Sequence, residues 1–132
     1  MSNYHMVEAR VFFDLRQRVG GELAMSRVLP EPTVESFDLT VILSALAEPG
    51  RRALMTALYR RAARDEPIDC MVIAQEVDLG VSAPTLSHHY RVLREAGLVR
   101  TTAVGRSRVV TVRITDVESR FPGLLDATLT AT

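Results

Sequence analysis

Apolar residues recur at three- and four-residue steps through the middle of the chain, which predicts a series of short helices. The first helix covers about residues 39–47, and the second covers about residues 49–64. Asp69 is expected to cap a third, short helix, which ends before Gly80 turns the chain. Three helices therefore precede position 82.

A fourth helix begins with stronger local signals. Ser82 is a good N-cap, Pro84 lies in the first turn, where the N–H that proline lacks is not needed, and Gly97 ends the helix. The residues expected on its buried side are Leu86, Tyr90 and Leu93. Two helices joined by a turn of about four residues are typical of a helix-turn-helix motif.

The apolar period changes to strict alternation after the fourth helix. Residues 99–103 and 110–114 alternate in polarity, and Gly105 lies where a hairpin must reverse. Residues from Asp116 on predict a short final helix with Phe121, Leu124, Leu125 and Leu129 on one face. The predicted fold class is mainly α (α+β), a winged helix-turn-helix with a two-stranded β wing.

Residues 1–33 allow two interpretations. Val7, Val11, Leu15 and Val19 form a helical stripe, but alternate positions from Val7 to Leu15 also fit a half-buried strand. Both interpretations stay open. The expected organisation is an N-terminal extension or dimer arm over residues 1–33 and a winged helix-turn-helix DNA-binding domain over residues 34–132.

Composition supports one core and excludes several classes of protein. The 132 residues, 47% of them hydrophobic, suffice for a single domain. No apolar run is long enough to span a membrane, and no secretory signal precedes the domain, which predicts a cytoplasmic protein without membrane partners. Cys70 is the single cysteine, which excludes multi-thiolate zinc sites. We expect no cofactor.

Sixteen basic and sixteen acidic residues give a formal charge of zero, so only the distribution of charge is informative. Residues 82–113 hold two histidines and a single acid, Glu95. The arginines in this stretch are Arg91, Arg94, Arg100, Arg106, Arg108 and Arg113. This local excess of positive charge, on a helix-turn-helix pattern, favours nucleic acid as the partner.

Three segments, LSALAEPGRRALMTAL, IAQEVDLGVSAPTLSHHYRVLREAGLVR and a Gly-Arg hairpin, resemble the ArsR-type (ArsR/SmtB) family of winged-helix repressors over about residues 37–115. The most specific positions are Ser82, Thr85, Ser87, His89, Leu93, Glu95, Ala96, Gly97 and Leu98. The resemblance implies a homodimer that binds double-stranded DNA at an inverted-repeat operator and leaves it when an inducer binds.

The chain departs from the metal-sensing members of that family. Their Cys-x-Cys matches Asp69 and Met71, which flank Cys70, and the final helix offers acids but no histidine. The acids on that helix are Asp116, Glu118 and Asp126. We therefore expect no metal site and an unknown inducer.

The residues expected to contact DNA lie on the outward face of the fourth helix and at the hairpin tip. They are Ser82, Pro84, Thr85, Ser87, His88 and Arg91 on the helix, and Arg106 and Arg108 at the hairpin. His89 is instead expected to pack beside the core as a hydrogen-bonded residue. The predicted function is that of a dimeric, sequence-specific transcriptional regulator that acts as a repressor.

Two alternatives remain beside that function. The first is a winged-helix module that binds only other proteins. The second is a redox-responsive regulator in which the helix dipole lowers the pKa of Cys70. Catalysis is not expected, because Ser87 and His88 diverge by about 100° on one helix and no catalytic motif occurs. The apolar stripes predicted to form a dimer are Leu39, Ile42, Leu43, Leu46 and Phe121, Leu124, Leu125, Leu129.

Overall fold

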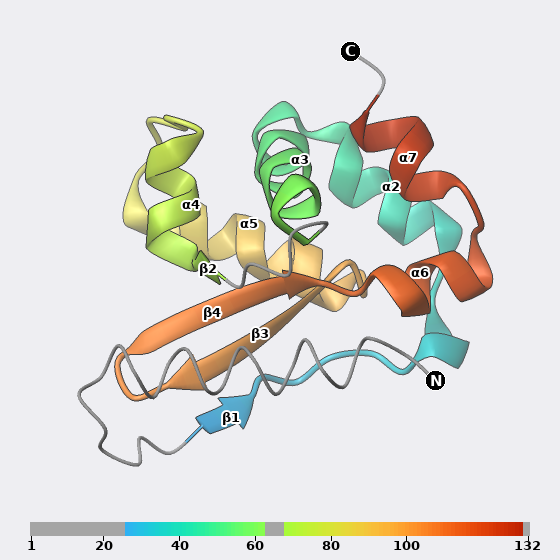
Figure 1. The fold of residues 1–132 in the computed structure, drawn as a ribbon, viewed down its shortest axis with the longest axis horizontal. Helices are drawn as coiled ribbons and strands as arrows, with labels where there is room; N and C mark the ends of the chain where they lie inside the picture. Colours follow the sequence, from blue (N-terminus) through green and yellow to red (C-terminus); the bar gives the residue numbers. More distant parts are fainter. Residues whose placement is uncertain (1–25, 63–67, 131–132) are drawn as a thin grey trace.

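Six α-helices and a four-stranded antiparallel sheet form the part of the chain that this computed structural model describes, residues 26–62 and 68–130 (Figure 1). In chain order the elements are β1 (Ser26–Val28), the 3₁₀ helix η1 (Val34–Ser36), α2 (Leu39–Ala47), α3 (Pro49–Ala62), β2 (Ile68–Asp69), α4 (Cys70–Glu76), α5 (Ala83–Glu95), β3 (Val99–Val104), β4 (Ser107–Val112), α6 (Ile114–Arg120) and α7 (Leu124–Leu129). The alternatives predicted for positions 7–19 lie outside the described residues.

Both ends of α2 are closed by side chains. The Asp38 carboxylate accepts hydrogen bonds from the amides of Thr40 and Val41, at 2.8 and 3.3 Å. At the other end, Arg51 donates to a carbonyl of the last turn at 2.7 Å, and Arg52 donates to the next carbonyl at 2.8 Å. These bonds satisfy backbone groups that a helix leaves without partners at its ends.

The predicted helix-turn-helix is confirmed in α4 and α5. Asp69 caps α4 by accepting from the Met71 amide at 2.8 Å, and Ser82 caps α5 by accepting from the Thr85 amide at 3.3 Å. Gly80, in the turn between the helices, has a φ of 67°. The local residue types thus determine where both helices begin.

The predicted hairpin is confirmed, and it belongs to a larger sheet than the sequence indicated. β3 pairs with β4 from Val99↔Val112 to Val104↔Ser107, and Gly105 turns the chain with a φ of 57°. The strand order is β1-β3-β4-β2, so each edge of the hairpin carries a further short strand. The two additional strands, of three and two residues, are too short to show an alternating pattern.

The core lies between the helices and one face of this sheet. Ile42, Leu54, Leu93 and Leu125, from α2, α3, α5 and α7, are fully buried there with Val110 of β4. The C-terminal helices therefore complete the same core as the helix-turn-helix. No helix of the described residues is long and apolar enough to cross a membrane.

Two expectations about the apolar surface need correction. The single final helix is two helices, because Gly123 takes a left-handed φ of 84° between α6 and α7. The stripes expected to remain for a dimer are partly used inside one chain, where Ile42, Leu46, Leu125 and Leu129 are buried. The exposed apolar residues of α2 are Leu39, Val41 and Leu43, at 43%, 47% and 45% exposure.

Candidate nucleic-acid interface

α5 has one buried face and one exposed face, as its apolar period predicts. The buried side chains are Leu86, His89, Tyr90 and Leu93. The exposed residues include all six that were expected to contact DNA: Ser82, Pro84, Thr85, Ser87, His88 and Arg91. Their exposure makes them available to a ligand, and their contact with DNA stays a prediction.

Ser82 and Thr85 have a structural role at the start of α5. The Ser82 hydroxyl accepts from the Thr85 amide and lies 3.0 Å from the Thr85 hydroxyl, to which it is hydrogen-bonded. These two side chains fix the N-terminus of the helix. The backbone N–H groups of that first turn form the positive end of the helix dipole, which attracts phosphate groups.

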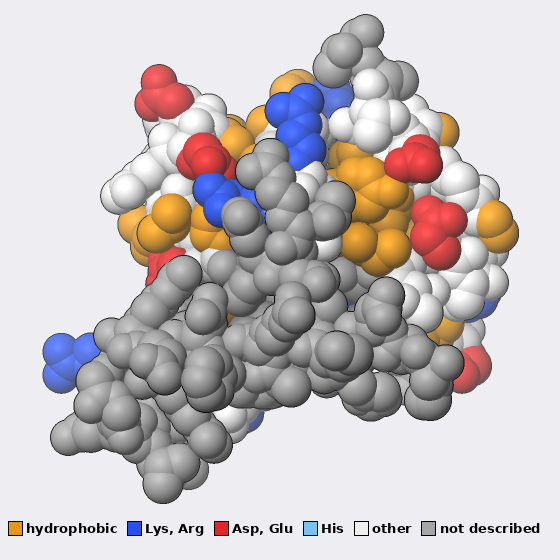
Figure 2. Space-filling view, viewed as in Figure 1, with side chains coloured by type: hydrophobic (Ala, Val, Ile, Leu, Met, Phe, Trp, Pro, Cys, Tyr) orange, Lys and Arg blue, Asp and Glu red, His pale blue; other side chains and the backbone are white. Residues whose placement is uncertain are grey.

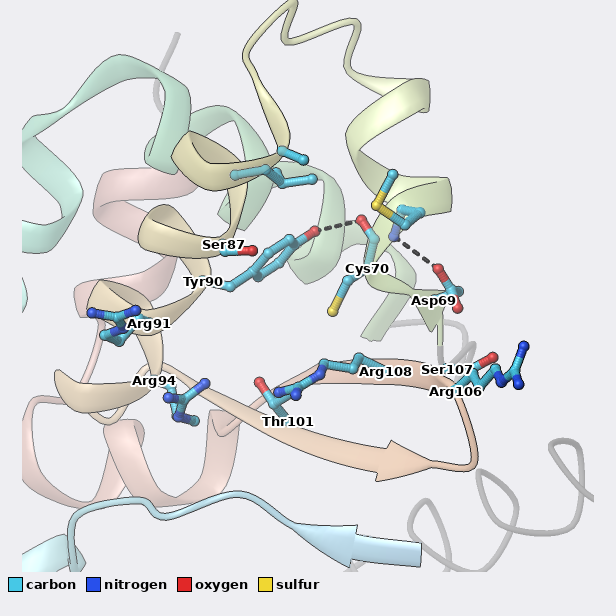
Figure 3. A pocket seen from close by; sticks show the side chains of 13 residues that line it. Asp69, Cys70, Ser87, Tyr90, Arg91, Arg94, Thr101, Arg106, Ser107 and Arg108 are labelled. Carbon is cyan, nitrogen blue, oxygen red and sulfur yellow. Dashed lines mark hydrogen bonds between the residues drawn. The ribbon is translucent and has the colours of Figure 1, made fainter. Parts of the chain in front are cut away.

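A cavity of about 490 Å³ separates α5 from the β3–β4 hairpin, and we call it the arginine cavity (Figure 3). Ser87 and Arg91 line it from α5, and Arg106 and Arg108 line it from the hairpin. Ser82, Pro84, Thr85 and His88 are not among its lining residues. The fold therefore brings two of the six predicted helix residues and both predicted hairpin residues to opposite sides of one cavity.

Sequence reasoning missed two polar residues of the arginine cavity. Arg94 follows Arg91 by three positions on α5, and its Nε atom is buried without a hydrogen-bond partner among the described residues. Thr101 of β3 is 1% exposed, and its hydroxyl also lacks a partner there. The helical spacing of Arg94 from Arg91 was the available signal, whereas nothing in the sequence marks Thr101.

The other two arginines of the basic stretch are structural. Arg100 donates to the Glu31 carboxylate, with Nη2 at 2.8 Å from Oε1. Arg113 is buried, donates from Nε to Asp116 at 3.0 Å, and lies over the Phe37 ring at 4.9 Å. The excess of positive charge seen in the sequence is thus concentrated in the four arginines of the cavity.

Cys70 does not have the environment that the redox alternative required. The thiol is buried at the inner wall of the arginine cavity, and burial raises its pKa to about 12. Arg108 and Arg94 act in the opposite direction but do not compensate for the loss of water. The lowered pKa expected from the helix dipole was therefore wrong, because desolvation dominates.

His89 packs beside the core, as predicted. Its Nδ1 lies 3.4 Å from Nη1 of Arg51, and its Nε2 lies 3.8 Å from Oε2 of Glu48. Burial lowers the pKa of His89, and Glu48 partly opposes that effect. Because an arginine only donates hydrogen bonds, Nδ1 must be the acceptor and the neutral ring carries its proton on Nε2.

Histidines, cysteines and carboxylates are the side chains that would hold a metal ion. Within residues 26–62 and 68–130, no three such side chains gather closely enough to do so. Asp69 and Cys70 are adjacent, but Met71 completes that segment without a strong ligand.

A capped helix-turn-helix, a hairpin beside its second helix and a cluster of arginines between them define a winged helix-turn-helix domain. Residues 46–102 match a protein family described as a helix-turn-helix domain. An uncharacterized HTH-type transcriptional regulator, YceK, of Bacillus subtilis (strain 168) is 28% identical over 85 residues, which cover 64% of this chain and 80% of that protein.

A solved structure has the same fold. The crystal structure of an ArsR family transcriptional regulator matches with a TM-score of 0.51 and 26% sequence identity, over 78% of this chain and all of the other. The chain is therefore similar, in fold and in sequence, to ArsR-type helix-turn-helix transcriptional regulators. A helix-turn-helix domain of this kind places its second helix in the major groove of double-stranded DNA.

Proposed function

We propose that the protein is a homodimeric repressor that binds an inverted-repeat operator, with α5 in the major groove and the hairpin beside it. The observation that carries this proposal is the position of Arg91 and Arg108 on opposite sides of the arginine cavity, where both border the same space. A helix fits the major groove, and arginines next to it neutralise phosphates.

The roles of the side chains follow from their places on α5. Ser82, Pro84 and Thr85 form the first turn and approach the DNA with the helix N-terminus. Ser87, His88 and Arg91 reach base edges or the phosphates next to them. Arg106 and Arg108 contact the backbone or the minor groove from the hairpin.

Two double variants test this division between helix and hairpin. His88→Ala with Arg91→Ala should reduce discrimination between operator and random DNA, by about 1–3 kcal/mol for each base that these side chains read. Arg106→Ala with Arg108→Ala should weaken binding to all DNA and reduce the slope of affinity against salt by about one unit per phosphate that the arginines neutralise. Footprinting upstream of the protein's own gene is the first search for the operator.

Arg60→Ala is the matched control, because Arg60 is an exposed arginine on α3 and does not line the arginine cavity. If the helix variant stays folded and dimeric but binds operator as well as the parent, α5 is not the reading helix. A flat salt dependence of the parent would instead favour a protein-interaction module.

The dimer is proposed to form through the exposed apolar side of α2. Leu39 and Leu43 are one helical turn apart, and apolar side chains gather over α2 and α7 on the face that Figure 2 shows. Two reading helices must lie about 34 Å apart to enter successive turns of the major groove, which requires two copies. The remaining segment, residues 1–33, is proposed as an extension or dimer arm of the domain at 34–132, except that β1 (Ser26–Val28) belongs to the sheet of that domain.

Sedimentation tests the dimer with a matched pair of variants. Leu43→Asp should shift the protein toward a monomer of 14.6 kDa. Val72→Asp is the matched control, because Val72 is 47% exposed and Leu43 is 45% exposed. It should leave the dimer intact, because Val72 lies on α4 and not on α2. A parent that is monomeric at micromolar concentration contradicts the proposed dimer.

The inducer is proposed to be something other than a metal ion. The support for this proposal is Met71 in place of a second thiolate beside Cys70, and carboxylates without histidine on the C-terminal helices. Elemental analysis of protein purified without added metal should find almost no zinc. One zinc per subunit that also weakens DNA binding would contradict the proposal.

A further inference from the structure

The arginine cavity has the size of a small-molecule site. Its volume of about 490 Å³ lies within the range of roughly 300–1,000 Å³ that is usual for such sites. Its walls come from three parts of the fold, namely α5, the start of α4 and the hairpin (Figure 3).

Two buried polar atoms in its wall lack a hydrogen-bond partner among the described residues. Arg94 Nε and the Thr101 hydroxyl are buried without partners among the described residues, although buried polar atoms nearly always have one. A single carboxylate, Asp69, lines the cavity, and it already accepts from the Met71 amide at 2.8 Å. Four guanidinium groups and one occupied carboxylate favour an anion with oxygen acceptors.

The inner wall is apolar. Leu86, Cys70 and the ring of Tyr90 line it, and the Tyr90 hydroxyl donates to the Cys70 carbonyl at 2.9 Å, so the ring is left as an apolar surface. The thiol is protonated, since burial raises its pKa to about 12. A ligand of this cavity therefore needs a compact apolar body as well as a charged head.

We propose that the arginine cavity binds a small organic acid, whose carboxylate or phosphate head accepts hydrogen bonds from Arg94 and Thr101 and whose apolar body lies against Leu86 and Tyr90. Arg91 and Arg108 line the cavity and are also proposed DNA contacts, so bound acid and DNA compete for them. This competition rests on the proposed function, whereas binding of the acid does not.

Benzoate, phenyl phosphate, benzamide and inorganic phosphate are the probes, each titrated into the full-length protein by calorimetry. Benzoate or phenyl phosphate should bind, raise the melting temperature and weaken operator binding. Benzamide has the same ring without charge, and inorganic phosphate has charge without the ring. Both should bind at least about tenfold more weakly, because benzamide lacks the charged head and inorganic phosphate lacks the apolar body.

Three variants locate the bound acid. Thr101→Val replaces a hydroxyl without a partner by a methyl group of similar size, so folding and DNA binding without the acid should be unchanged. Acid binding should fall about tenfold in Thr101→Val and further in Arg94→Ala, in keeping with the loss of charge-assisted hydrogen bonds. Arg60→Ala, the arginine control on α3, should bind the acid as the parent does.

The outcomes separate this inference from the proposed function. A parent that binds operator but neither organic acid at millimolar concentration overturns the inference and leaves the proposed function standing. Equal binding of inorganic phosphate and benzoate, or unchanged affinity in both cavity variants, also overturns it. Acid binding in a parent that binds no DNA supports the site and contradicts the proposed function.

Discussion

The arginines outside the arginine cavity, in what we call the body of the fold, and those that line the cavity are in opposite environments. In the body, arginine side chains donate hydrogen bonds to backbone carbonyls or to carboxylates. Examples are Arg51, Arg52, Arg100, Arg113 and Arg120. In the cavity, no carboxylate of the described residues forms an ion pair with Arg91, Arg94, Arg106 or Arg108. The same residue type therefore stabilises one region and leaves the other able to bind an anion.

The difference arises from partners that are distant in sequence. Glu31 lies 69 residues before Arg100, and the carbonyl of Pro32 lies 81 residues before Arg113. These partners remove two positive charges from the surface of a stretch that looks uniformly basic in sequence. Positive charge that is available for DNA is consequently a property of the folded chain.

The largest effect is expected when a body arginine loses its side chain. Arg113→Ala leaves the Asp116 carboxylate without its partner and removes the cation from the Phe37 ring, so it should destabilise the fold by about 3–5 kcal/mol. The Nε atom of Arg94 has no hydrogen-bond partner among the described residues, so Arg94→Ala breaks no bond there. It should lower the free energy of unfolding by less than about 1 kcal/mol. Urea unfolding monitored by circular dichroism measures both. Equal reductions in the free energy of unfolding would contradict the difference between the two regions.

A pair of glycines extends the comparison to packing. Gly97 and Gly80 both have positive φ, but a Cβ on Gly97 would collide with the Phe37 ring, whereas nothing lies within 4 Å of a Cβ on Gly80. Gly80→Ala should lower the free energy of unfolding by about 1–2 kcal/mol, because alanine is strained at this positive φ. Gly97→Ala adds overpacking and should cost about 2–5 kcal/mol. Similar melting temperatures for the two variants would show that the ring moves aside freely.

Local signals made most of the helical fold predictable. Asp69, Ser82 and Pro84 mark helix starts through short-range hydrogen bonds and fixed backbone angles, and each lies where the sequence placed it. The buried face of α5 followed from its apolar period. The hairpin followed from alternation around Gly105.

The remaining features depend on distant contacts. The strand at 26–28 exists because it pairs with β3, and three residues carry no period of their own. The break at Gly123 was visible as a Pro-Gly pair, but the apolar face on both sides favoured one helix. The cavity combines Thr101 with residues of two helices, an arrangement that no motif records. Contact between DNA and any named side chain stays a prediction.

The smallest effect concerns two adjacent histidines of α5, of which only one is packed against the body. His89 is buried against Arg51 and Glu48, whereas His88 is exposed on the face proposed to meet DNA. Burial lowers the pKa of His89 below its ordinary value of about 6.5. Between that lowered pKa and about pH 6.5, the unfolded chain binds more protons at this position than the folded chain does. The free energy of unfolding of the parent therefore decreases, through this histidine, as the pH falls below about 6.5.

His89→Gln tests this because glutamine can accept a hydrogen bond from Arg51 but does not titrate. The difference in unfolding free energy between the parent and this variant should shift in favour of the variant as the pH falls from 7.5 toward 5, because only the parent must keep an imidazole neutral. His88→Ala is the control and should stay close to the parent, because its ring is exposed and its charge is the smallest of the effects that shift the pKa of His89. Urea unfolding at several pH values measures the effect. If the His89→Gln and parent curves stay parallel over that range, protonation at position 89 is not linked to folding, and the buried and the exposed histidine do not differ as their environments require.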